Sequence, residues 1–168
     1  MEYFKNCDCI EELKKQYKKL CFKYHPDISK EANANGTMKK VNSEYDELFD
    51  KLKNVFKNQK GKVYTNSKPV SETPEEFRNI INALIGLEGI EVELIGRWIW
   101  VIGNTKPHKQ KLKELKFRWC KKKVAWSWHR AEDSTISKGN YTLSEIREKY
   151  GSTIYKKSNM PEIEAKAS

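Results

Sequence analysis

A helix that is stopped by proline constrains the N-terminal part of this chain more than any other feature. Apolar side chains recur there at three- and four-residue steps, as on one face of an amphipathic helix: Ile10, Leu13, Tyr17, Leu20, Cys21 and Tyr24. Pro26 lacks a backbone N–H and disfavours helical geometry at the residue before it. The pattern therefore predicts a helix with Asp8 as its N-cap that ends near Tyr24 or His25.

A second helical stripe follows a polar loop and Gly36. Its members are Met38, Val41, Tyr45, Leu48, Leu52 and Val55. Two amphipathic helices joined by about a dozen residues can close a small core by antiparallel packing. We therefore expect a helical hairpin with His25, Pro26 and Asp27 at its exposed tip.

The remaining face of the first helix is basic. Five lysines, hereafter the lysine ridge, recur on it at helical steps: Lys14, Lys15, Lys18, Lys19 and Lys23. The whole chain has 33 Lys and Arg against 23 Asp and Glu, which gives a formal net charge of +10. This balance favours an acidic partner, such as a nucleic acid, a ribosome or an acidic protein groove.

Over residues 2–57 the sequence resembles the J-domain of DnaJ-type co-chaperones. The likeness rests on Tyr3 and Phe4 in a short first helix, on a basic helix ending in KYHPD, and on a further helix reading MKKVNSEYDELFDKL. J-domains bind the nucleotide-binding domain of a DnaK-type heat-shock chaperone and stimulate its ATP hydrolysis. The resemblance implies that Asp27 pairs with a partner arginine, positioned by His25 and Pro26. It also implies that the lysine ridge docks on acidic partner surface.

Two other interpretations of His25-Pro26-Asp27 stay open. The three residues could serve only to end the helix, with His25 at its negative end and Asp27 in an Asx-type turn. A catalytic pair, with His25 as the base, lacks an evident nucleophile in the sequence. We therefore expect a protein that is not an enzyme and needs no cofactor. The chain has no Gly/Phe-rich segment and no repeated Cys-x-x-Cys-x-Gly-x-Gly. This favours a minimal class in which a J-domain carries a specialised module.

The rest of the chain predicts a linker and a second domain. Polar residues without apolar periodicity mark the linker, and a helix signal follows it, with Thr73 as N-cap, Pro74 at the first position and Glu76 at the capping-box site. The predicted divisions are a J-domain at 1–57, a linker at 58–72, a second domain at 73–151 and a flexible tail at 152–168.

The second domain should be a small α+β unit. The stripe of its first helix comprises Phe77, Ile80, Ile81, Leu84 and Ile85. An alternating hairpin, IEVELIGRWIWVIG, comes next, then a short helix, a second strand pair (FRWC and VAWSWH) and a last helix capped by Thr142 and Glu145. The fold class is therefore α+β overall, with an all-α hairpin in front of an α+β domain.

The second domain combines basic and aromatic residues. Between Glu88 and Arg130 lie all five tryptophans, with eight Lys and three Arg against four Glu. Such a composition suits single-stranded nucleic acid, because cations bind phosphates and aromatic faces stack on bases. The candidate residues are Trp98, Trp126, Arg118, Lys121, Lys122 and Lys123. A surface for a client or partner protein, and an aromatic core with a solvated basic face, fit the same composition.

Cysteine spacing and hydropathy set the remaining bounds. Cys7, Cys9, Cys21 and Cys120 match no usual zinc-ligand spacing, so we interpret them as packing residues and expect no metal site. No apolar run approaches the roughly 20 residues of a membrane span, and the first residues lack a signal-peptide pattern. We therefore expect a soluble, cytoplasmic protein with no membrane contact.

Overall fold

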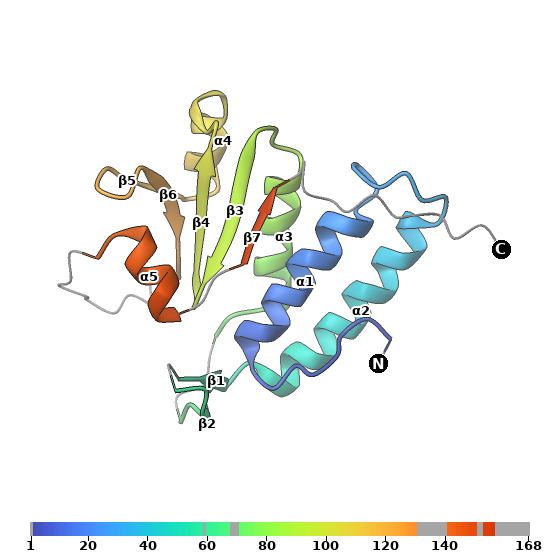
Figure 1. Ribbon diagram of the computed structural model, residues 1–168. Helices are drawn as coiled ribbons and strands as arrows, with labels where there is room; N and C mark the ends of the chain where they lie inside the picture. The colour runs from blue at the N-terminus through green and yellow to red at the C-terminus, as the bar shows by residue number, and fades with distance from the viewer. Residues whose placement is uncertain (1, 59, 68–70, 131–140, 151–152, 157–168) are drawn as a thin grey trace.

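Two antiparallel helices form the N-terminal part of the protein (Figure 1). The computed structural model describes residues 2–58, 60–67, 71–130, 141–150 and 153–156. Helix α1 spans Ile10–Tyr24 and helix α2 spans Ala34–Leu52. Their apolar stripes meet, and the tilted rings of Tyr17 and Tyr45 pack together with centroids 4.1 Å apart in a fully buried position. The predicted helical hairpin is confirmed.

The segment before α1 differs from the prediction. Residues 2–9 contain no helix, whereas the resemblance predicts a short one around Tyr3 and Phe4. The Tyr3 backbone N–H instead donates to Glu44 at 2.9 Å, and Phe4 is buried beside the ring of Tyr45. Helix nucleation is unfavourable, so in a segment this short tertiary contacts outweigh one turn of helix.

Both helices also begin at other residues than predicted. Cys9, not Asp8, is the N-cap of α1, and no side chain caps that helix. Helix α2 begins at Ala34, before Gly36 rather than after it. Glycine fits in this first turn because a Cβ at position 36 would clash with the side chain of Asn33.

A small antiparallel hairpin follows α2. Strand β1 (Val55–Lys57) pairs with strand β2 (Val63–Thr65). Val55 therefore belongs to a strand and not to the stripe of α2. Because β2 lies within the segment predicted as a linker, that segment is partly regular structure. The division of the chain into separate domains stays a prediction.

Helix α3 (Pro74–Ile85) begins as its sequence predicts. The Glu76 backbone N–H donates to Thr73 Oγ1 at 3.4 Å, and Pro74 occupies the first turn. The whole predicted stripe is buried: Phe77, Ile80, Ile81, Leu84 and Ile85. Through this stripe α3 packs on both α1 and α2 and covers one face of the sheet that follows.

The second sheet has five strands in the order β5-β6-β4-β3-β7, all antiparallel to their neighbours. Its first four strands in chain order are β3 (Ile90–Ile95), β4 (Trp98–Gly103), β5 (Arg118–Cys120) and β6 (Ala125–Trp128). A 3-10 turn, η1 (Lys106–His108), and helix α4 (Lys109–Glu114) connect β4 to β5. The predicted order of elements and the α+β fold class are confirmed.

Helix α5 (Leu143–Tyr150) starts with the predicted capping box. The Thr142 N–H donates to the Glu145 carboxylate at 2.6 Å, and the Glu145 N–H donates to Thr142 Oγ1 at 3.3 Å. The chain then returns as strand β7 (Thr153–Lys156), which pairs with β3. The predicted flexible tail is therefore wrong for residues 153–156. Residues 152 and 157–168 lie outside the described part.

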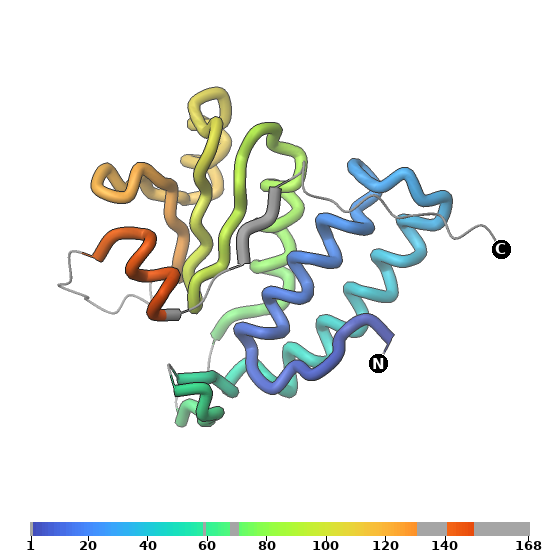
Figure 2. Tube along the Cα trace, viewed as in Figure 1, coloured from blue at the N-terminus to red at the C-terminus, as the bar shows by residue number. Residues whose placement is uncertain are grey.

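One hydrophobic core joins the helical hairpin to the region from α3 to β7, hereafter the C-terminal module. Tyr17 of α1, Phe77 of α3 and Ile99 of β4 are all fully buried in it. A smaller core on the other face of the sheet contains Trp100 and is covered by α5. Figure 2 shows α1 and α2 on one side of the molecule and the β5–β6 hairpin on the other. The sheet edge formed by β5 is thus far from the helical hairpin.

Candidate functional site

The His25-Pro26-Asp27 turn lies at the end of α1, as predicted. His25 is the C-cap and has an extended backbone (ψ 133°), the geometry that a following proline favours. Its carbonyl oxygen accepts hydrogen bonds from the N–H groups of Ile28 (3.0 Å) and Ser29 (2.8 Å). These two bonds fix the shape of the turn.

Within this turn a partly buried histidine binds the backbone of Asp27, whose carboxylate is exposed. The Asp27 N–H donates to His25 Nδ1 at 3.2 Å, and an Asp27 carboxylate oxygen lies 3.7 Å from the same nitrogen. In a neutral ring that accepts at Nδ1, the proton lies on Nε2. The His25 side chain is 14% exposed and that of Asp27 is 71% exposed. The Asp27 carboxylate is thus open to a cation of a partner.

Three members of the lysine ridge reach solvent. Lys19 is exposed, and Lys15 and Lys23 are half-buried. The ammonium nitrogen of Lys23 lies 4.6 Å from the centroid of the Tyr24 ring, a cation–π contact beside the turn. These three cations lie on the same helix as the His25-Pro26-Asp27 turn and form a positive surface next to it.

The prediction that all five ridge lysines are exposed is wrong for Lys14 and Lys18. Lys14 is buried, and its Nζ lies 2.5 Å from a carboxylate oxygen of Glu72. Lys18 is fully buried, and its Nζ donates to the main-chain oxygen of Val92 at 3.0 Å. Burial lowers the pKa of Lys18 to about 7, opposed by the charge of Glu93. Both lysines therefore hold the C-terminal module.

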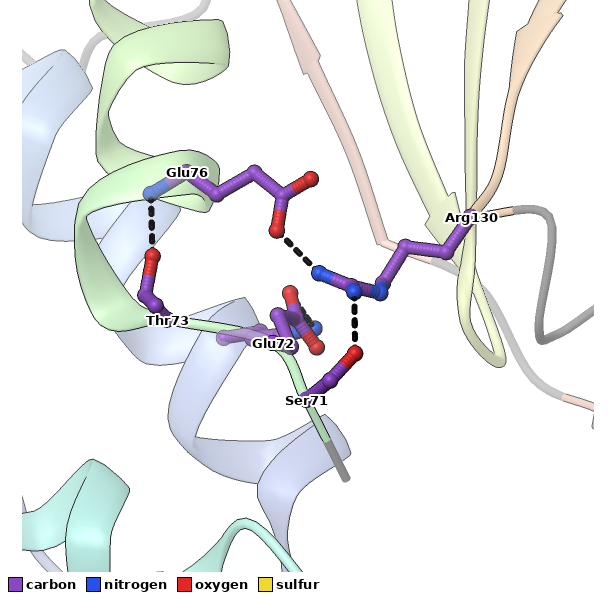
Figure 3. Close-up of polar contacts among 6 residues, drawn as sticks. Ser71, Glu72, Thr73, Glu76 and Arg130 are labelled. Carbon is purple, nitrogen blue, oxygen red and sulfur yellow. Dashed lines mark hydrogen bonds and ion pairs between the residues drawn. The ribbon is translucent and has the colours of Figure 1, made fainter. Parts of the chain in front are cut away.

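Arg130 clamps the segment that carries Glu72 (Figure 3). It follows β6 and donates from Nη2 to Ser71 Oγ at 2.7 Å and from Nη1 to the Glu76 carboxylate. Glu76 therefore contributes its N–H to the cap of α3 and its side chain to Arg130. Sequence reasoning missed Glu72 and Arg130, because 58 residues separate them and no local pattern links them.

The structure separates the candidate aromatic and basic residues of the C-terminal module. Trp126 is 5% exposed in the main core, so no base can stack on it. Trp98 is half-buried, with its ring centroid 3.9 Å from that of His129. Trp119, which sequence reasoning did not single out, is 45% exposed and adjoins the exposed Arg118.

The lysine turn between β5 and β6 is mostly open. Lys121 and Lys122 are exposed, and Lys123 is half-buried with its ammonium nitrogen 5.9 Å from the ring centroid of Trp100. Trp119 and this turn therefore belong to one hairpin, at the edge of the sheet.

Burial makes two of the cysteines poor nucleophiles. Burial raises the pKa of the Cys7 thiol to about 11 and that of Cys21 to about 12, which keeps both protonated near neutral pH. In the described part of the chain, no three His, Cys, Asp or Glu side chains gather as metal ligands would. Over the same residues, no helix has the length and apolar character needed to cross a bilayer.

Comparison with known proteins identifies the helical hairpin. The family model of the DnaJ domain matches this part of the chain. Residues 5–55 are therefore a DnaJ domain. The His25-Pro26-Asp27 turn and the lysine ridge therefore both lie within the DnaJ domain, and the C-terminal module lies outside it.

Several relatives share this domain. The chain is 46% identical over 52 residues to the chaperone protein DnaJ of Shouchella clausii (31% of this chain, 14% of the relative). It is 47% identical over 51 residues to that of Enterococcus faecalis (30% and 13%) and 43% identical over 56 residues to that of Listeria welshimeri (33% and 15%). The chain thus spans about a seventh of the length of these relatives. No solved structure matches it significantly.

Proposed function

We propose that this protein is a co-chaperone that binds a DnaK-type chaperone in the cytoplasm and stimulates its ATP hydrolysis. The observation that carries the proposal is the fixed His25-Pro26-Asp27 turn, with its exposed carboxylate, inside a DnaJ domain. The protein itself is then not an enzyme, because the hydrolytic chemistry belongs to the chaperone.

The turn and the ridge have separate tasks in this proposal. Asp27 forms a charge-assisted pair with an arginine of the chaperone, while His25 and Pro26 hold it in position. Lys15, Lys19 and Lys23 attract the acidic surface of the chaperone before contact is made. Such long-range attraction mainly speeds association and is weakened by salt.

Single-turnover ATP hydrolysis by a purified DnaK-type chaperone tests the proposal with the full chain. We expect wild type to accelerate hydrolysis and both Asp27→Asn and His25→Gln to lose most of the acceleration. Asp27→Asn removes the charge but keeps the backbone N–H that binds His25, so it tests the carboxylate itself.

Asp50→Asn is the matched control. Asp50 lies on α2 of the same domain, and its side chain is 73% exposed, close to the 71% of Asp27. It should behave as wild type. Absence of acceleration by wild type would overturn the proposed function. Acceleration that survives in both turn variants would overturn only the assignment of the turn.

We further propose that the C-terminal module recruits a client or nucleoprotein complex. A strongly basic surface on the module favours single-stranded nucleic acid as its ligand. From residue 106 to residue 123 the chain has nine cations and one acidic residue, Glu114. Eight of these cations are exposed and, with Trp119, make up what is hereafter the basic surface: Lys106, Lys109, Lys111, Lys113, Lys116, Arg118, Lys121 and Lys122.

The basic surface suits a flexible polyanion with exposed bases. Trp119 lies on β5, the edge strand opposite the DnaJ domain, and offers an exposed ring among cations that can bind phosphates. Stacking of one base on such a ring contributes roughly 1 to 3 kcal/mol. In this proposal the β5 edge of the sheet binds nucleic acid, while the DnaJ domain on the other side of the molecule binds the chaperone.

Fluorescence anisotropy with a labelled single-stranded oligonucleotide tests the second proposal. Trp119→Ala should weaken binding by about 5- to 150-fold, the factor that corresponds to the loss of roughly 1 to 3 kcal/mol of stacking. The control is Tyr141→Ala, because Tyr141 is also 45% exposed but lies outside the basic surface. Equal binding by wild type and Trp119→Ala would instead favour a client protein as the ligand of the module.

A further inference from the structure

The C-terminal module covers part of the lysine ridge. Glu72 of the segment before α3 pairs with Lys14, and the main-chain oxygen of Val92 in β3 accepts from Lys18. Two of the five ridge cations are therefore buried by the module and the segment just before it, while Lys15, Lys19 and Lys23 still reach solvent.

Further contacts hold the module on the DnaJ domain. Phe77 of α3 packs against Tyr17 and Tyr45, with ring centroids 6.1 and 6.3 Å apart. Arg78 Nη1 of the same helix lies 2.8 Å from a carboxylate oxygen of Asp46 on α2. The interface thus combines a buried aromatic centre with two ion pairs, Lys14–Glu72 and Arg78–Asp46.

We propose that the C-terminal module and a DnaK-type chaperone compete for the same face of α1. This inference rests on the proposed function. In the structure, which we call the closed form, Lys14 and Lys18 are buried against the module and the segment before it. In the chaperone-bound form, the module moves off α1, and all five ridge cations face the acidic surface of the chaperone.

The chemistry of the two lysines offsets part of the apolar burial that is lost when the module leaves α1. Burying an ammonium group such as that of Lys18, which donates to the Val92 carbonyl oxygen, removes the hydration of the charge. Return to water beside an acidic partner restores hydration and adds Coulomb attraction. Release of Glu72 has the same effect on a buried carboxylate.

Competition between the module and the chaperone for α1 must weaken the binding of each by the same factor. If docking of the module weakens chaperone binding, chaperone binding must weaken docking of the module by the same factor. The module therefore controls how readily the DnaJ domain engages the chaperone. A ligand that draws the module away from α1 would act as an activator.

Hydrogen–deuterium exchange of the full chain, with and without an ATP-bound DnaK-type chaperone, tests this reciprocity directly. We expect backbone amides of α3 and of residues 71–73 to exchange faster in the complex, while α1 stays protected. A complex in which α3 keeps the protection that it has in the free protein would overturn the inference.

A charge reversal tests it from the other direction. Glu72→Lys places a cation beside Lys14 and leaves α1 unchanged, so the variant should stimulate ATP hydrolysis at about tenfold lower concentration than wild type, within the usual range of coupling between sites. The matched control is Glu75→Lys, which makes the same charge change at an exposed position three residues on. It should match wild type.

The outcomes separate the inference from the proposed function. Equal stimulation by wild type and Glu72→Lys, together with unchanged exchange of α3 in the complex, overturns the competition but leaves the co-chaperone function intact. Absence of stimulation and of complex formation by both proteins overturns the function, and the competition with it.

Discussion

The ammonium nitrogen of Lys14 lies 2.5 Å from a carboxylate oxygen of Glu72, although the residues are 58 positions apart and belong to different predicted domains. Their side chains are 11% and 5% exposed. A basic helix that sequence reasoning assigns wholly to an external partner thus has an internal partner as well. The same contact ties the position of α3 to the surface of the DnaJ domain.

Removal of one member of this pair should destabilise the protein. Glu72→Gln leaves a buried ammonium group without its counter-charge, which costs about 3 kcal/mol when a buried pair is broken. Urea unfolding followed by circular dichroism measures the loss. Glu75→Gln, at an exposed position, should change the free energy of unfolding by about 0.5 kcal/mol or less. Equal effects of the two substitutions would contradict the buried pair.

Because the pKa of Lys18 is lowered, we expect the free energy of unfolding to rise with pH. Burial lowers its pKa from 10.5 to about 7, with Lys15 acting in the same direction and Glu93 opposing. The unfolded chain therefore binds more protons than the folded protein between these two values. The free energy of unfolding should increase as pH rises above about 7, by up to about 1.4 kcal/mol per pH unit. Below about pH 7 the dependence on this group disappears.

Urea titrations between about pH 7 and pH 8.5 measure the slope. The window ends below the ordinary thiol pKa of 9.0. Above that pH, the raised pKa values of Cys7 and Cys21 make the free energy of unfolding fall with pH, which would mask the rise due to Lys18. Lys18→Met should flatten the slope and raise stability at pH 7, since it removes a buried amine. An unchanged slope in that variant would assign the dependence to other groups.

The ridge lysines that reach solvent should control the rate of chaperone binding. Replacing Lys19 and Lys23 with glutamate should slow association about tenfold at low salt and have less effect at high salt, because exposed charges act through long-range attraction. Stopped-flow mixing measures this rate. Replacing Lys39 and Lys40, both exposed on α2, makes the same charge change on another face. A similar loss there would attribute the effect to net charge alone.

Salt should weaken oligonucleotide binding in proportion to the phosphates contacted. Lys121→Gln with Lys122→Gln should reduce the slope of log affinity against log salt by about 1.4, because each lost phosphate contact on a single strand removes about 0.7. Titrations at several salt concentrations give the slope. Lys39→Gln with Lys40→Gln removes the same charge elsewhere and should leave it unchanged. No salt dependence in wild type would exclude this mode of binding.

Local patterns determined most of the secondary structure. The stripes of α1, α2 and α3 and the alternation of β3 and β4 each reflect which side of one element is apolar, and this information is contained in the segment itself. The same holds for the caps at Thr73 and Thr142. The turn at Pro26 follows from the chemistry of proline alone. These features needed no knowledge of the rest of the chain.

Only the tertiary structure decided what covers the polar faces. Lysine and glutamate are rarely buried, so a sequence pattern assigns Lys14, Lys18 and Glu93 to solvent. Their burial depends on Glu72, Val92 and Arg147, which approach from distant parts of the chain. Strand β7 is too short to show a period and forms by pairing with β3. Trp119 and Trp126 are directly opposite each other on β5 and β6, with ring centroids 5.5 Å apart. Trp119 is 45% exposed because it lies on the edge strand, whereas Trp126 lies on the inner strand and is buried in the main core. Alternation alone does not determine which strand forms the edge.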